Sequence, residues 1–281
     1  MARYAFEVIR LLPVVKAYPA LSRTYGEVSC VAGVQMGDGG PAGWIRLYPV
    51  PFRALEDARR FRKYEPMTVR VARPRSDRRP ETRRPDVDSI VPSGHLLPSS
   101  NAWRARRAWI EPLMVDSMCE LRRRQRKDGT SLGIFRPADI TGLVIEPVDV
   151  RIARREMAKT LVRQASLLDP ESDQRRQLRA LELMPYAFKY RYRCTDPRCR
   201  GHEQSLTDWE VFRFYQRVRG KPDWEDRMRA RFIGDLCAPE RDTALVVGNQ
   251  HQHPDSFLVL SVWWPPKQPE QLRLLGELSD G

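Results

Sequence analysis

The sequence predicts an α+β fold, with a small antiparallel β-barrel-like sheet at the N-terminus and a mixed α/β half that contains a Cys-Cys-His turn. Three observations lead to this prediction. Short apolar segments alternate with Gly- and Pro-containing turns over the first 90 residues, which is typical of small antiparallel sheets. Segments of helical and of strand periodicity alternate in the remainder. Two cysteines and one histidine lie within nine residues, at 194–202.

The first 90 residues contain a series of short β-branched segments. Strands are predicted at residues 4–16, 27–35, 44–50 and 67–72, and the Gly-rich turn at 37–41 joins the second and third into a hairpin. The strand–loop–strand pattern with Trp44-Ile-Arg-Leu-Tyr48 resembles small nucleic-acid-binding barrels, but it contains no motif that specifies a family.

Two basic segments interrupt these strands. Phe52, Leu55, Ala58 and Phe61 follow helical spacing, which predicts a helix over residues 52–64. Arginines and prolines dominate the segment that begins at residue 73, and it has almost no apolar residue to bury, so we expect an exposed loop there.

The Pro- and Ser-containing segment 90–103 is typical of a linker. We therefore expect a β-rich basic domain at 1–90 and a mixed domain at 104–281. In the second domain, helices are predicted near 110–128, 152–168, 171–183, 207–219 and 223–236, and strands near 143–146, 187–193, 243–248 and 256–264.

Residues 187–193 have the clearest strand alternation in the chain. Phe188, Tyr190 and Tyr192 lie on one face, and Lys189, Arg191 and Arg193 lie on the other. Packing in a core explains the aromatic face without further assumption. Base stacking beside phosphate contacts is the alternative interpretation.

This strand leads into the turn that holds Cys194, Cys199 and His202. Thiolate and imidazole are the usual ligands of tetrahedral zinc, so the turn predicts a structural zinc site. The fourth ligand must come from elsewhere: His251 and His253 are the first candidates, then Cys237, and then a carboxylate from Glu203 or Asp208. A catalytic zinc with an open position and a turn without metal are the alternatives.

The net charge of the chain is +13, and arginine greatly outnumbers lysine, 42 to 7. The charge is concentrated: residues 53–84 hold 12 basic and 5 acidic side chains, and residues 104–127 hold 8 and 3. Such segregation predicts a surface for a polyanion, most simply nucleic acid. The side chains expected to contact phosphate are Arg59, Arg60, Arg62, Lys63, Arg75, Arg78, Arg79, Arg83, Arg84, Arg122, Arg123, Arg124 and Arg126.

Carboxylates within the arginine-rich loop are the candidates for catalysis. Asp77 and Glu81 could hold the Mg²⁺ that activates water in a nuclease. Acids spaced among arginines more often form ion pairs. No nucleophile elbow, zinc-protease helix, phosphate loop or dinucleotide fingerprint is present, so an enzyme is not the leading prediction. Cys30 and Cys119 lie on apolar-patterned elements, and nothing beside them in the sequence activates either thiol.

Five cysteines, no secretory signal and no long apolar run lead us to expect a cytoplasmic protein with reduced thiols and no membrane span. The leading hypothesis is a nucleic-acid-binding protein with a structural zinc site. The alternatives are a metal-dependent nuclease or another nucleic-acid-processing enzyme, and an adaptor whose basic face meets an acidic protein partner.

Overall fold

The computed structural model describes residues 5–22, 26–152, 154–155, 158–159 and 182–268. It confirms the α+β fold and the closed five-stranded barrel at the N-terminus. The first half contains the strands β1 (Glu7–Lys16), β2 (Ala20–Ser22), β3 (Gly26–Gly37), β4 (Gly40–Val50), β5 (Met67–Ala72) and β6 (Thr82–Pro92).

The barrel sheet runs β1-β5-β6-β4-β3, and pairing of β1 with β3 closes it. All neighbours are antiparallel except β4 and β6, which are parallel. This is the strand order of an OB-fold barrel, with β3 and β4 as its second and third strands. The short strand β2 adds to the outer edge of β3.

Alternation along the strands explains how the barrel fills its interior. Leu11, Val31, Leu47 and Val69 point inward with other aliphatic side chains and are fully buried. A bulge between Pro13 and Val15 lets β1 bend from its pairing with β5 to its pairing with β3.

The helix predicted over residues 52–64 is wrong. Two short 3₁₀ turns occupy this segment instead, at Phe52–Ala54 and Asp57–Arg59. Leu55 and Glu56 adopt extended backbone angles between the turns and interrupt any helix. Leu55 and Phe61 are nevertheless buried in the barrel core. The apolar spacing therefore identified buried residues correctly, although the segment is not a helix.

The arginine-rich segment is shorter and more ordered than predicted. Strand β6 begins at Thr82, and the preceding loop packs against the second half of the chain. Arg79 donates from Nη1 to the carbonyl of Asn249 at 2.7 Å, and Glu81 accepts from the backbone N–H and hydroxyl of Ser131 at 2.8 and 2.6 Å. Polar contacts with the second half thus order a loop that lacks apolar residues.

The second half contains two three-stranded sheets with helices around them. The strands are β7 (Leu132–Phe135), β8 (Asp139–Pro147), β9 (Tyr186–Arg193), β10 (His202–Ser205), β11 (Ala244–Gln250) and β12 (His253–Trp263), and the sheet orders are β10-β9-β8 and β12-β11-β7. The helices are α1 (Ser100–Ile110), a 3₁₀ turn (Glu111–Leu113), α2 (Met118–Asp128), α5 (Trp209–Val218), α6 (Trp224–Arg229) and a π-helical turn (Ala230–Asp235).

The single helix expected near 110–128 is also wrong at its start. Ser117 caps α2 by accepting from the backbone N–H of Glu120 at 3.0 Å, so the helix begins at Met118, eight residues after Ile110. Its end is as predicted, at Gly129 in the left-handed conformation with φ of 79°. The helices predicted over 152–168 and 171–183 fall largely outside the described residues.

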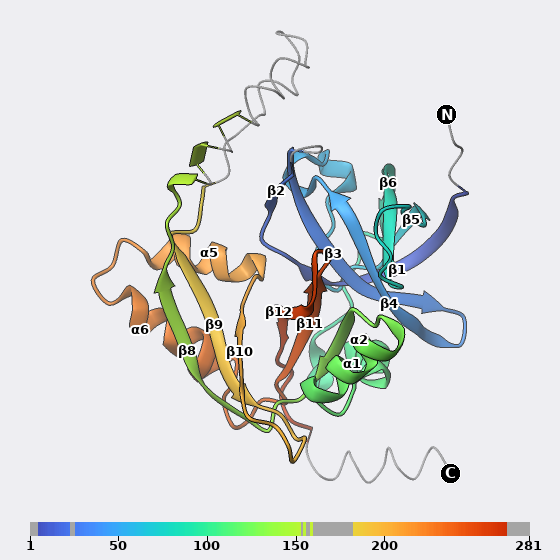
Figure 1. Cartoon of the computed structure of the whole chain (residues 1–281). Helices are drawn as coiled ribbons and strands as arrows, with labels where there is room; N and C mark the ends of the chain where they lie inside the picture. The colour runs from blue at the N-terminus through green and yellow to red at the C-terminus, as the bar shows by residue number, and fades with distance from the viewer. Residues whose placement is uncertain (1–4, 23–25, 153, 156–157, 160–181, 269–281) are drawn as a thin grey trace, which may run out of the picture.

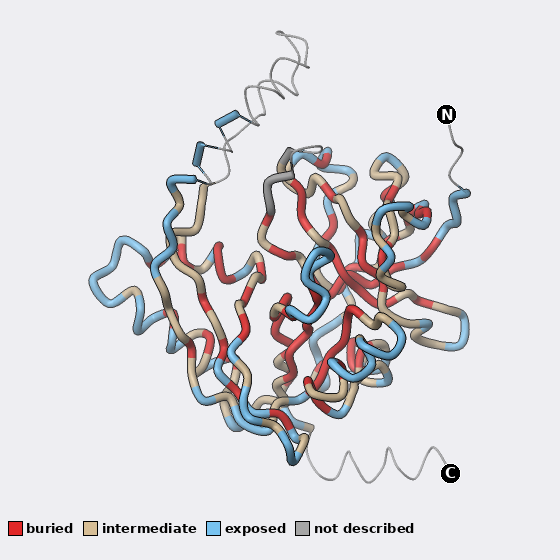
Figure 2. Tube along the Cα trace, viewed as in Figure 1, coloured by how far each residue is buried: buried red, intermediate tan, exposed pale blue. Residues whose placement is uncertain are grey.

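Strands β11 and β12 lie between the barrel and the sheet formed by β8, β9 and β10 (Figure 1). Their two faces therefore contribute to two different cores. Figure 2 shows that both strands are largely buried. Val247 and Val259 pack with Phe188, Tyr190 and Tyr192. The aromatic side of β9 is thus core, as its alternation predicted.

The opposite face of β11 and β12 packs against the outside of the barrel. Ala32 and Val34 of β3 lie in one cluster with Ile134, Val246 and Trp263 from the second half. OB-fold barrels use the face of these two strands to bind oligonucleotides or oligosaccharides. Here that face is buried by the protein's own second half.

A buried ion pair also joins the two halves. Lys63 Nζ lies 2.7 and 3.0 Å from the carboxylate oxygens of Asp208, 3.0 Å from Ser261 Oγ and 3.2 Å from Glu210 Oε1. Asp208 also caps α5, because its side chain accepts from the backbone N–H of Glu210.

Among the helices that the structure describes, none has both the length and the apolar character needed to cross a bilayer.

Candidate metal centre

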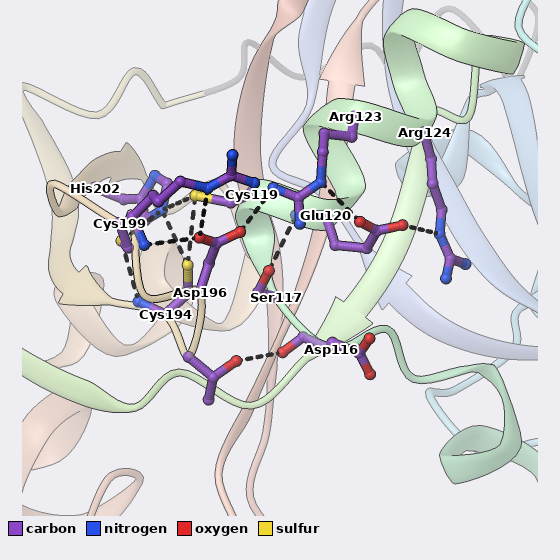
Figure 3. A network of polar contacts seen from close by, with 12 residues as sticks. Asp116, Ser117, Cys119, Glu120, Arg123, Arg124, Cys194, Asp196, Cys199 and His202 are labelled. Carbon is purple, nitrogen blue, oxygen red and sulfur yellow. Dashed lines mark hydrogen bonds and ion pairs between the residues drawn. The ribbon is translucent and has the colours of Figure 1, made fainter.

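Four metal-ligating side chains meet at one point between α2 and the turn that joins β9 to β10 (Figure 3). They are Cys119, Cys194, Cys199 and His202, and their ligand atoms all lie within 4.8 Å of one another. Three of the four are the residues that the sequence had singled out. The cluster could therefore hold a metal ion, with three sulfurs and one nitrogen.

Four of the six distances between the ligand atoms are close to those expected around a single tetrahedral ion, and the other two are at most 4.8 Å. With Zn–S near 2.3 Å and Zn–N near 2.0–2.1 Å, tetrahedral ligands lie about 3.8 Å apart for two sulfurs and about 3.5 Å apart for sulfur and nitrogen. The Sγ atoms of Cys119 and Cys194 are 3.6 Å apart. His202 Nε2 lies 3.7, 3.5 and 3.3 Å from the sulfurs of Cys119, Cys194 and Cys199.

The turn at residues 194–202, hereafter the knuckle, is shaped by its own backbone. Gly201 has φ of 93°, a left-handed conformation that residues with a Cβ avoid. It allows the backbone N–H of Gly201 to approach Cys199 Sγ at 3.3 Å, while the N–H of Cys194 approaches the same sulfur at 3.5 Å. These donors would stabilise a thiolate at Cys199.

Two further contacts fix the knuckle to the start of α2. Thr195 donates its hydroxyl to the carbonyl of Asp116 at 2.7 Å, and Arg123 donates to Asp196 at 2.7 Å. Asp196 also accepts from the backbone N–H of Arg198 at 2.9 Å. Cys119 is therefore held opposite the knuckle by contacts that do not involve any ligand atom.

The surroundings of the cluster favour a neutral imidazole at His202 and shift the pKa values of two of the thiols in opposite directions. Burial, together with the nearby Arg122 guanidinium, lowers the pKa of His202. Burial also raises the pKa of Cys119 to about 12, helped by the neighbouring sulfur of Cys194. At Cys194 burial acts in the same direction, but hydrogen bonds from the backbone and from the other two thiols outweigh it and lower the pKa.

The other predicted ligands lie outside the cluster. His251 is half exposed, with Nδ1 3.3 Å from a carboxylate oxygen of Asp77, and His253 is exposed at the start of β12. Cys237 donates its thiol to the carbonyl of Phe232 at 3.2 Å. Of the two carboxylates, Glu203 pairs with cations of β9 and Asp208 with Lys63.

Cys119 was not among the ligands predicted from the sequence, because it lies 75 residues before the nearest other member of the cluster. It follows Met118, which is fully buried, so the helical pattern suggested a core thiol. A weak signal was available: α2 is strongly basic, and a cysteine on such a helix has few apolar neighbours.

The two carboxylates proposed for catalysis face donors rather than each other. Asp77 accepts from Arg79 Nη2 at 2.6 Å and from Arg79 Nε at 3.0 Å. Burial alone would raise the pKa of Asp77, but the hydrogen bonds from Arg79 outweigh it and lower that pKa. Glu81 is bonded to Ser131, as described above. Neither belongs to a metal-ligand group among the residues that the structure describes.

The predicted phosphate-binding cations fall into different environments. Lys63 and Arg79 are largely buried in contacts with the second half. The following are held by carboxylates, by backbone oxygens or by further contacts: Arg59, Arg60, Arg62, Arg75, Arg83, Arg84, Arg123, Arg124 and Arg126. Arg78 and Arg122 are exposed, and neither has a carboxylate partner within the part of the chain that is described.

The fold and the site thus define an α+β protein in which a five-stranded barrel packs on a half that carries a Cys₃His cluster. The chain belongs to the family described as Domain of unknown function (DUF8757), whose profile matches residues 114–279 and so includes all four members of the cluster. A second profile, Domain of unknown function (DUF8758), matches residues 7–112, which include the barrel. No curated protein matches the chain.

Proposed function

We propose that this chain is a nucleic-acid-binding protein with a structural zinc ion bound by Cys119, Cys194, Cys199 and His202. The convergence of these four ligand atoms, all within 4.8 Å of one another, is the observation that carries the metal part of the proposal. A zinc ion here would cross-link α2 to the knuckle.

The donor set favours zinc in a structural role. Three thiolates and an imidazole form one of the common ligand sets of structural zinc, and four protein ligands leave no position for a catalytic water. The five cysteines are all free, which suits a reducing compartment such as the cytoplasm. The zinc-dependent catalysis considered from the sequence is therefore the less favoured interpretation.

The nucleic-acid part of the proposal is supported by charge. The net charge of +13 comes mainly from arginine, whose guanidinium binds phosphate in a bidentate manner. The OB-fold strand order is a weaker support, because a fold is shared by many functions and the usual ligand face is buried here. The placement of Asp77 and Glu81 gives no specific support to the nuclease alternative.

The metal is tested by elemental analysis of the purified protein. We expect about one zinc per chain in the parent and in a Cys237→Ser control, because Cys237 lies outside the cluster. Cys119→Ser and Cys199→Ser should each lose most of the zinc, whereas the double variant His251→Ala, His253→Ala should retain it. Retention of zinc by both cysteine variants would contradict the assignment.

Nucleic-acid binding is tested by fluorescence anisotropy with a labelled oligonucleotide of mixed sequence, as a single strand and as a duplex. We expect a dissociation constant in the range of about 10⁻⁴–10⁻⁶ M near physiological salt, with strong salt dependence. An unrelated protein of equal size and net charge is the control. Binding no tighter than that of the control would reject this part of the proposal and favour an acidic protein partner.

A further inference from the structure

The cations beside the metal centre differ from those of residues 56–65 in the barrel half, because fewer of them are paired with a carboxylate. Helix α2 and residues 193–203 together hold eight cations and four carboxylates. All four carboxylates are already engaged: Glu120 by Arg123 and Arg124, Asp196 by Arg123, Asp128 by the backbone and hydroxyl of Thr130, and Glu203 by Lys189 and Arg191 of β9.

Several cations of this region remain without a carboxylate partner among the described residues. These exposed side chains are Arg122 and Lys127 on α2, Arg193 at the end of β9 and Arg200 in the knuckle. Arg122 follows the ligand Cys119 by three residues on α2, almost one helical turn, which places it beside the cluster. The metal centre is thus bordered by uncompensated positive charge from both elements.

Helix α2 also borders a surface pocket of roughly 540 Å³, lined by Glu120, Arg123, Arg124, Lys127, Asp128 and Thr130. Its two carboxylates are the engaged ones described above, so the donors that remain come from the cations. Such a concave surface lined by Arg123, Arg124 and Lys127 suits the oxygens of a phosphodiester.

Residues 56–65 of the barrel half offer a less favourable surface. Residues 56–65 hold four cations and three carboxylates, and one of those cations, Lys63, is buried against Asp208. The remaining three, Arg59, Arg60 and Arg62, each have a carboxylate partner within the same segment. The segment is therefore close to neutral toward solvent, and the neighbouring barrel face is covered by the second half.

We propose that α2 and the knuckle form the phosphate-binding face of the protein, and that the metal holds these two elements in the geometry that this face requires. This inference rests on the proposed nucleic-acid function and narrows it to one of the two basic regions. The ligand is the backbone of a nucleic acid, recognised by charge with little dependence on sequence.

Two triple variants with the same change in net charge test the position of the face. Arg122→Gln, Arg193→Gln and Arg200→Gln remove exposed cations of the proposed face. Their matched control replaces Arg10, Arg73 and Arg78, which are exposed cations of the barrel half without a carboxylate partner among the described residues. Anisotropy is measured with the same duplex oligonucleotide over a range of salt concentrations, and the zinc content of each protein is checked.

We expect the first triple variant to weaken binding at every salt concentration. It should also flatten the slope of log K against log salt by about 2–3, since each lost duplex phosphate contact contributes about 0.9. The control should change the slope by less than about 1. Equal losses in the two variants would overturn the assignment and indicate that net charge alone sets the affinity.

The role of the metal is tested without changing any cation. Cys199→Ser is compared with Cys237→Ser, and circular dichroism establishes that both proteins are folded. We expect Cys199→Ser to lose zinc and to bind the duplex several-fold more weakly, while Cys237→Ser behaves as the parent. A folded, zinc-free Cys199→Ser protein with parental affinity would overturn this coupling. Absence of binding by the parent would instead reject the underlying function.

Discussion

Replacing Lys63 by methionine should remove the buried ion pair that joins the two halves. The Lys63 side chain is 10% exposed and the Asp208 side chain 5%, so the variant leaves a carboxylate buried without its cation. Breaking a buried pair by removing one partner typically costs about 3–5 kcal/mol. We place the loss at the lower end of that range, since Asp208 keeps its hydrogen bond from the backbone N–H of Glu210.

The free energy of unfolding is measured by urea denaturation, followed by both tryptophan fluorescence and circular dichroism. Lys189→Met is the matched control, because Lys189 pairs with Glu146 and Glu203 on an exposed face of β9. The control should shift the midpoint very little. If the Lys63→Met protein is as stable as the Lys189→Met protein, the buried pair of Lys63 and Asp208 does not contribute the expected stability.

The same substitution has a pH signature. Burial raises the pKa of Asp208 in the folded protein, and removal of Lys63 should raise it further. The folded variant then holds this proton more tightly than the unfolded chain does, where the pKa is about 3.9. The loss of stability should thus be smallest below about pH 4 and should grow as the pH rises through the pKa of folded Asp208. A pH-independent loss would argue against an ionised Asp208.

Three further outcomes follow from other contacts. Gly33→Ala should destabilise the barrel by about 1–3 kcal/mol, because its Cβ would lie 2.2 Å from the carbonyl oxygen of Leu12, whereas Gly39→Ala, with nothing within 4 Å, should be nearly neutral in thermal denaturation. Burial alone would raise the pKa of Asp242, but Arg136 and a second guanidinium outweigh it and lower that pKa to about 2. The stability lost in Asp242→Asn should therefore be constant above about pH 4 and should decrease toward pH 2, as measured by unfolding at a series of acid pH values. Chelation of the metal should lower the melting temperature of the parent but not that of Cys199→Ser.

Patterns that depend on near neighbours were predictive. Alternation in residues 187–193 located β9 and its buried aromatic face, and the short spacing of Cys194, Cys199 and His202 located three members of the cluster. Gly129 marked the end of α2. In each instance the physical cause, strand alternation, turn geometry or a left-handed cap, acts within a few residues.

Features that depend on distant partners could not be predicted in this way. Cys119 completes the cluster from another element, and Lys63 meets Asp208 at a separation of 145 residues. The segment 52–64 has helical apolar spacing, yet its apolar residues are buried by packing in the barrel core. Tertiary contacts overrode local propensity there, as they often do for short segments.

Charge shows the same limit. Lys63 and Arg122 both lie in basic stretches of the sequence, and composition gives them the same predicted role. In the structure Lys63 is paired with the buried carboxylate of Asp208, while Arg122 is exposed on α2 beside the ligand Cys119. A Cys₃His zinc centre would itself carry about one negative charge, so Arg122 has two possible partners: the centre and an external phosphate. An Arg122→Gln variant separates these two roles. If Arg122 contacts phosphate, the substitution should flatten the salt dependence of nucleic-acid binding, and if Arg122 pairs only with the metal centre, that salt dependence should stay unchanged.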